Sequence, residues 1–104
     1  MAGWAYILEC SDGNYYVGST VDLSVRLRQH NEGLGAVYTR HRLPVRLVWS
    51  AHFERIDEAF VFEKKIQGWS RRKRQALIEG RLGDLGWLSS RSYDTKKRLR
   101  EMDR

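Results

Sequence analysis

A chain of 104 residues has room for one domain with a modest core, so an architecture with two full domains is excluded. Its composition, 41% hydrophobic and 31% charged, is that of a folded globular protein and excludes wholesale disorder. The net charge of +6 favours an anionic partner, because a basic surface concentrates phosphates around it. The single cysteine, Cys10, excludes an internal disulfide, and we expect it to be a buried strand residue.

The first twenty residues predict an antiparallel hairpin. Residues 4–10 are aromatic and aliphatic, residues 11–14 are rich in turn formers, and residues 15–19 return to β-favouring types. Side chains alternate between the two faces of a strand. Tyr6 and Tyr16 therefore share a face only if the sequence numbers of two residues that pair across the hairpin add up to an even number. This requires a hairpin loop with an odd number of residues, or a bulge. We predict that register.

A short helix and a loop follow the hairpin. Thr20 or Asp22 can cap an amphipathic helix that ends at residues 31–33. Residues 34–44 predict a surface loop with room for a helical turn, because Pro44 disfavours helix immediately before it.

The remaining pattern predicts one strand and two helices. Residues 45–52 are rich in β-branched and aromatic types, as in a strand. Residues 57–67 follow a helical period that Gly68 ends, and Ser70 can cap a last helix that Gly80 closes. The order β-β-α-β-α-α lacks βαβ alternation, so we predict an α+β fold with a three-stranded antiparallel sheet flanked by helices.

Charge and hydropathy suggest how the chain is organised. We expect a domain in residues 1–80 and a basic tail in residues 81–104, whose seven Lys or Arg and four acidic residues give the charge profile of an interaction tail. No basic leader with a following apolar stretch opens the chain, and no apolar run reaches membrane-spanning length. The expectation is a cytoplasmic protein with no membrane partner. The oligomeric state is not indicated.

Five side chains fall on these elements in an order that resembles the GIY-YIG nuclease family. They are Tyr6 in the first strand, Tyr16 in the second, Arg26 and His30 in the first helix, and Glu63 in the next long helix. The segment Tyr16-Val17-Gly18 stands where the family has Tyr-Ile-Gly. The resemblance covers about residues 4–79 and extends to small stand-alone bacterial members, with some likeness to the structure-selective nucleases of eukaryotes. It implies the GIY-YIG fold.

The chain departs from the family pattern at several points. Trp4 and Ala5 stand where the family has glycine and isoleucine, and Ser19 stands where repair-type members often carry a lysine. We find no counterpart of an asparagine that some members use late in the domain. Gly18 fits either a close approach of a substrate backbone or a bulge in the sheet.

The resemblance implies hydrolysis of DNA phosphodiester bonds with one Mg²⁺ or Mn²⁺ ion, and the residue types suit that chemistry. Arg26 can donate two parallel hydrogen bonds to phosphate oxygens, which a lysine cannot. Glu63 can hold a hard cation that keeps most of its waters. The resemblance implies Tyr6 as the residue that activates water, with Tyr16 and His30 in its hydrogen-bond chain, but the sequence does not decide which of the three takes the proton. We expect one site, in which Arg26 and Glu63 approach the face that carries both tyrosines.

Eight further residues are candidates for DNA contact, and a solvated surface explains most of them equally well. They are Ser19, Arg28, Arg40, Arg42, Arg71, Arg72, Lys73 and Arg74. We expect selection of branched or single-stranded DNA by shape, in repair or recombination, because the chain has no room for a second domain that reads sequence. The alternative is a nucleic-acid-binding module that keeps the fold and cleaves negligibly.

Overall fold

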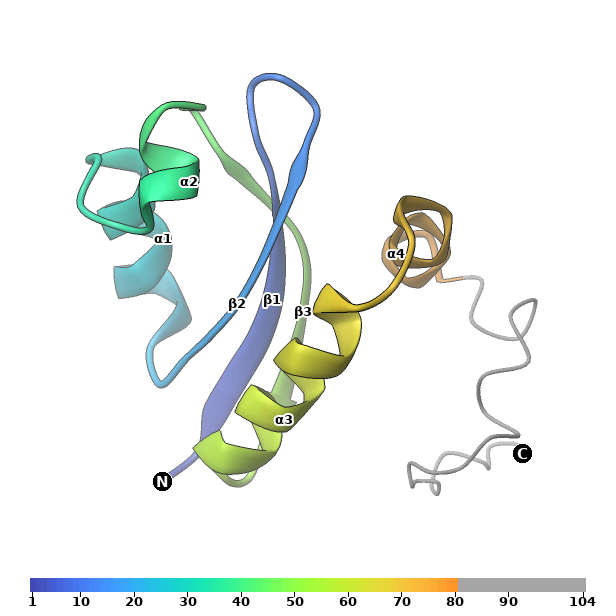
Figure 1. Ribbon diagram of the computed structural model, residues 1–104. Coiled ribbons are helices and arrows are strands. Elements are labelled where there is room, and N and C mark those ends of the chain that lie inside the picture. The colour runs from blue at the N-terminus through green and yellow to red at the C-terminus, as the bar shows by residue number, and fades with distance from the viewer. Residues whose placement is uncertain (81–104) are drawn as a thin grey trace. The chain divides into compact units, whose positions relative to one another are not determined.

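The computed structural model describes residues 1–80, so the expected tail lies outside the described residues (Figure 1). The chain divides into two compact units, Met1–Gly68 and Trp69–Arg104, and each is described by itself. The elements in chain order are β1 (Gly3–Glu9), β2 (Tyr15–Thr20), α1 (Leu23–Asn31), α2 (Val37–Arg40), β3 (Arg46–Phe53), α3 (Ile56–Gln67) and α4 (Arg71–Ile78). The strands form an antiparallel sheet in the order β2-β1-β3. The α+β prediction is confirmed, and α2 is the helical turn for which the loop had room.

The hairpin has the register that two tyrosines on one face require. Tyr6 pairs with Gly18, and the numbers of paired residues sum to an even value along the whole ladder. The loop between the strands is odd in length, and Gly13 within it has φ 85°, a left-handed conformation that favours glycine. Tyr6 and Tyr16 therefore lie on the same face, as predicted, with ring centroids 6.5 Å apart.

Helix α1 covers the face of the sheet that carries the two tyrosines. A buried cluster of Tyr6, Leu8, Cys10 and Val45 forms the core there, and the partly buried leucines of α1 pack against it. Cys10 is buried, as expected, although it lies one residue beyond β1. Because these leucines hold α1 against this face, Arg26 and His30 of the same helix also lie beside the tyrosines.

Helix α3 covers the opposite face. Its Phe62 ring contacts the rings of Trp49 and Phe53, with centroid distances of 6.0 and 5.6 Å. Trp49 pairs with Ile7, so these rings project from the face opposite Tyr6. The two long helices of the first unit therefore sandwich the sheet, as Figure 1 shows.

Side-chain caps set where α1 begins and how its end is held. The carboxylate of Asp22 accepts a hydrogen bond from the Val25 N–H at 3.1 Å, which makes Asp22 the cap of the two candidates. At the other end, the Asn31 amide donates to the Val45 carbonyl at 3.0 Å and accepts from the Val45 N–H at 2.8 Å. This pair of bonds ties the end of α1 to the start of β3.

The described part of the second unit is α4 with its flanks. The Ser70 hydroxyl accepts a hydrogen bond from the Lys73 N–H at 3.2 Å, which confirms the predicted cap, and Gly80 follows the helix with φ 78°. Within residues 1–80, no helix is both long and apolar enough to cross a membrane.

Candidate active site

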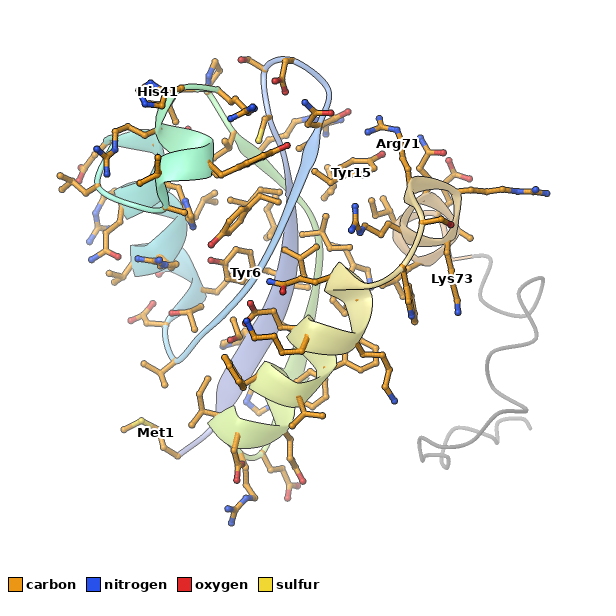
Figure 2. All side chains as sticks on the ribbon, in the orientation of Figure 1. Met1, Tyr6, Tyr15, His41, Arg71 and Lys73 are labelled. Atoms are coloured by element: carbon orange, nitrogen blue, oxygen red, sulfur yellow. The ribbon has the colours of Figure 1, made fainter. Side chains whose placement is uncertain are left out.

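A chain of buried hydrogen bonds starts at the Tyr6 hydroxyl. The Tyr6 oxygen lies 3.0 Å from Nε2 of His30, and Nδ1 of the same ring lies 2.8 Å from the hydroxyl of Thr39. Figure 2 shows the Tyr6 side chain on the side of the sheet where α1 lies. Tyr6 is 1% exposed, and His30 and Thr39 are 0% exposed. Three elements, β1, α1 and α2, therefore contribute one residue each to a chain that is almost fully buried.

The α1–α2 loop encloses the His30 ring. A Cβ atom at Gly35 would collide with Nδ1 of that ring, so only glycine lets the backbone pass so close. On the other side, the Tyr16 ring meets His30 edge-on at 5.2 Å and stacks on the exposed Tyr38 ring at 6.2 Å. His30 is therefore a closed-in part of the site, and not a solvated histidine at a helix end.

Gly18 is explained by the Tyr6 ring. A Cβ atom at Gly18 would lie 2.5 Å from the Tyr6 hydroxyl oxygen and 3.2 Å from the Tyr16 ring. The β1–β2 ladder has no bulge at this point; the sheet's irregularity lies between β1 and β3, at Ile7 and Leu8. The missing side chain thus makes room for the two phenol rings, a reason that the sequence pattern did not include.

Burial moves the pKa values of Tyr6 and His30 in opposite directions. Loss of solvent raises the pKa of Tyr6 to about 12, an effect that the hydrogen bond and charge of Arg26 partly offset. Loss of solvent and then the Arg26 charge lower the pKa of His30 to about 4. Burial likewise raises the pKa of Tyr16. At neutral pH the site therefore rests as two phenols and a neutral imidazole.

The depressed pKa of His30 predicts a loss of stability in acid. Between its ordinary value of 6.5 and about 4, the unfolded chain binds a proton that the folded chain does not, so stability falls as pH falls. The shift corresponds to about 3 kcal/mol of unfolding free energy by pH 4. Urea denaturation at pH 7 and pH 4.5 measures it. The His30→Gln variant should lose this part of the pH dependence; an unchanged slope in that variant would contradict the buried neutral state.

Arg26 supplies positive charge beside the phenols. It projects from α1, where its Nη1 donates to the Gln29 side-chain oxygen at 3.2 Å. Hydrogen bonding and charge from Arg26 both act to lower the pKa values of Tyr6 and Tyr16 against the effect of burial. Arg26 is thus within reach of both hydroxyls, where its guanidinium can also meet a phosphate.

Glu63 reaches the site from the other side of the sheet. Its Oε1 accepts a hydrogen bond from the Ser19 hydroxyl at 2.6 Å, and its Oε2 accepts one from the Gln67 amide at 2.7 Å. Ser19 faces away from Tyr6 on β2, so the expectation that Glu63 would approach the tyrosine face is wrong. The reason is tertiary: α3 packs on the opposite face, and β2 is an edge strand around which the two sides can meet.

The charge of Glu63 nevertheless acts on the phenols. Although burial is the main cause, the Glu63 carboxylate is one of the groups that raise the pKa values of Tyr6 and Tyr16. Arg26 and Glu63 therefore both act electrostatically on the two tyrosines, and Arg26 also acts on His30.

The Glu63 carboxylate fits a hydrated divalent cation. Its side chain is 10% exposed, and Oε2 also lies 3.8 Å from Nζ of Lys64. Each oxygen accepts one hydrogen bond and retains a lone pair for a further partner. No group of three or more His, Cys, Asp or Glu able to hold a metal occurs in residues 1–80. One carboxylate suits Mg²⁺ or Mn²⁺, which keep several waters, and does not suit a metal that needs a full set of protein ligands.

The structure gives the eight candidates for DNA contact different surroundings. Ser19 is bonded to Glu63, and Arg42 is bonded to the Asp12 carboxylate at 3.0 Å and to the Tyr38 carbonyl at 2.8 Å. Arg28 and Arg40 are exposed on α1 and α2. The remaining four belong to the second unit, where Arg71 and Lys73 project from α4 (Figure 2): Arg71, Arg72, Lys73 and Arg74.

Comparison with known families identifies the family of this chain. The family model of the GIY-YIG catalytic domain matches residues 2–76. The chain belongs to the GIY-YIG family. Membership makes it a nuclease-type domain and implies a nucleic-acid substrate.

Relatives and solved structures match most of the chain. The UPF0213 protein BH0048 of Halalkalibacterium halodurans is 44% identical over 78 residues, which is 75% of this chain and 83% of that protein. The solution NMR structure of UPF0213 protein BH0048 from Bacillus halodurans matches with a TM-score of 0.52 and 42% identity, over 80% of this chain and 88% of that chain. That of EF2693 from E. faecalis matches with a TM-score of 0.53 and 32% identity, over 77% and 85%. The GIY-YIG fold expected from the sequence is therefore shown.

Sequence reasoning missed three residues that support the site. Gln67 lies one helical turn beyond Glu63, and that i,i+4 spacing was a usable signal for a partner of the carboxylate. Gly35 had no such signal, and Thr39 was noted only within Tyr38-Thr39-Arg40, a segment similar to small bacterial members of the family. The roles of both residues depend on how the α1–α2 loop folds over His30.

Proposed function

We propose that this GIY-YIG protein is a metal-dependent DNA endonuclease that hydrolyses phosphodiester bonds, selects its substrate by shape, and acts in repair or recombination. The observation that carries the proposal is the buried hydrogen bond between the Tyr6 hydroxyl and Nε2 of a neutral His30, beside Arg26. A phenol with a basic nitrogen behind it and a cation beside it is suited to take a proton from water at a phosphate.

Proton movement must accompany attack. With a pKa of about 12, a free Tyr6 phenolate at pH 7 would cost about 7 kcal/mol, more than the 4 kcal/mol of an unburied tyrosine. We therefore assign the Tyr6 oxygen to accept a proton from the attacking water while its own proton passes to Nε2 of His30. As the water oxygen bonds to phosphorus, the bond to the leaving 3′-oxygen breaks, and that oxygen takes a proton from solvent.

Arg26 and Glu63 are assigned to stabilise the negative charge that develops on the phosphate and on the leaving oxygen. Arg26 donates hydrogen bonds to the non-bridging phosphate oxygens, where negative charge grows during attack. Ser19 and Gln67 hold the Glu63 carboxylate in place to bind one Mg²⁺ or Mn²⁺. When bound, the ion supplies Lewis-acid stabilisation of the phosphate and the leaving oxygen. Arg28 and Arg40 are exposed and suit contacts to the DNA backbone.

Removal of the metal tests the proposal. We expect nicking of plasmid, branched or single-stranded DNA in Mg²⁺ or Mn²⁺, loss of nicking with EDTA, and recovery on adding excess Mg²⁺. Gel assays measure the cutting, and fluorescence anisotropy at several salt concentrations measures binding. Salt-sensitive binding without cleavage under any of these conditions would contradict an endonuclease and support a binding module. Cleavage that persists in EDTA would contradict the role of the metal.

A further inference from the structure

Thr39 is the one buried residue of the short helix α2, and its hydroxyl faces the imidazole of His30. It is 0% exposed and lies 2.8 Å from Nδ1. The two are nine positions apart in sequence, and the loop between them folds back so that Gly35 covers the ring. The Thr39 hydroxyl thus occupies a closed place where water cannot substitute for it.

Counting donors decides the direction of the hydrogen bonds. The Thr39 hydroxyl has one proton, and it donates that proton to the Ala36 carbonyl at 3.0 Å. The Thr39 oxygen must then accept a hydrogen bond from His30, so Nδ1 carries the imidazole proton. Because neutral imidazole has only one ring proton, Nε2 is left as an acceptor, and the Tyr6 hydroxyl 3.0 Å away donates to it.

The opposite tautomer would disable the arrangement. With the proton on Nε2, Tyr6 would face an N–H group and its own proton would have no acceptor on the ring. Thr39 would also have to turn its proton from Ala36 to Nδ1, which would leave the Ala36 carbonyl with only its helical partner, the Arg40 N–H at 3.1 Å. Because the buried Thr39 hydroxyl donates its proton to the Ala36 carbonyl, it favours the Nδ1–H tautomer of His30 over the Nε2–H tautomer.

We infer that Thr39 is a positioning residue of the nuclease site: its hydroxyl holds His30 in the Nδ1–H tautomer and keeps Nε2 open to the proton of Tyr6. The inference rests on the proposed function for its effect on rate. Its effect on the ring itself does not depend on any reaction. The two can therefore be tested apart.

The test compares Thr39→Val with Thr39→Ser. Valine keeps the shape of threonine and removes the hydroxyl, whereas serine keeps the hydroxyl and removes the methyl group. Long-range ¹H–¹⁵N correlation spectra of ¹⁵N-labelled protein report the tautomer, with His30→Gln to assign the ring. We expect Nδ1–H in the parent and in Thr39→Ser, and a shift towards Nε2–H in Thr39→Val. Nicking by Thr39→Val should fall about 10- to 100-fold in kcat, with KM unchanged and with activity retained in Thr39→Ser.

Each other outcome counts against the inference. An Nε2–H imidazole in the parent overturns it directly, whether or not the protein cuts DNA. Thr39→Val with an unchanged tautomer, or Thr39→Ser as damaged as Thr39→Val, shows that the side chain only fills space. If the parent cuts no DNA in any metal, the proposed endonuclease function fails, and the parent spectrum still decides whether Thr39 sets the tautomer.

Discussion

Replacing Glu63 with glutamine is expected to abolish DNA cleavage, with a loss of about 10³-fold or more. The change removes the negative charge that would hold the cation and keeps the shape of the side chain. The new amide can accept the hydrogen bond from Gln67 and donate to the Ser19 oxygen, so the contacts that hold it on β2 and α3 can persist. DNA binding and the folded state should therefore survive the loss of activity.

Three measurements distinguish the loss of the Glu63 charge from a loss of folded structure. Nicking assays give the rate, urea denaturation gives stability, and calorimetric titration with Mn²⁺ gives metal affinity, which Glu63→Gln should lose. Ser19→Ala is the matched control, because it removes one hydrogen bond to the carboxylate and leaves the charge. We expect it to cut more slowly than the parent and far faster than Glu63→Gln. Cleavage by Glu63→Gln at the parent rate would remove Glu63 from the mechanism.

Replacing Tyr6 with phenylalanine should lower kcat by about 10²- to 10⁴-fold, the usual contribution of a general base. The phenylalanine ring keeps the packing over Gly18 and loses only the oxygen that meets His30. It also leaves Nε2 of a buried imidazole without its donor, which costs about 1–3 kcal/mol of stability. Urea denaturation therefore accompanies the single-turnover nicking rates, at a temperature where both proteins are folded.

Tyr16→Phe is the matched comparison for Tyr6, because it removes the same atom from the neighbouring ring on the same face. Tyr16 contacts the His30 ring edge-on and also lies within reach of Arg26. We expect a smaller loss of activity than in Tyr6→Phe. A larger loss in Tyr16→Phe would transfer the role of base to Tyr16, and parent-like rates in both variants would leave neither tyrosine in that role.

The elements of this protein could be predicted because their signals are local. The odd loop with Gly13 determines the register of the hairpin, and that register alone puts Tyr6 and Tyr16 on one face. Asp22 and Ser70 accept hydrogen bonds from the first turns of their own helices, so the starts of α1 and α4 follow from a few neighbouring residues. The residue types of the five-member site followed from family resemblance, and each suits the reaction.

How those residues meet was decided by the tertiary structure. The sequence placed Glu63 on a helix but could not show that the helix packs on the face opposite Tyr6, because both faces of a three-stranded sheet need cover. Ser19, expected at the DNA, instead holds that carboxylate. Helix periodicity identifies the apolar face of α3. It does not identify the face of the sheet on which that apolar face packs.

The chemical state of the site also depends on the fold. By itself the sequence determined that Tyr6 and His30 are present on a strand and a helix, with ordinary pKa values of 10.0 and 6.5. Only the folded chain, with the α1–α2 loop closed over His30 and Thr39 behind it, moves these values to about 12 and about 4 and selects one tautomer. Spacing is a property of neighbouring residues, whereas a pKa depends on what excludes water, and here segments distant in sequence exclude it.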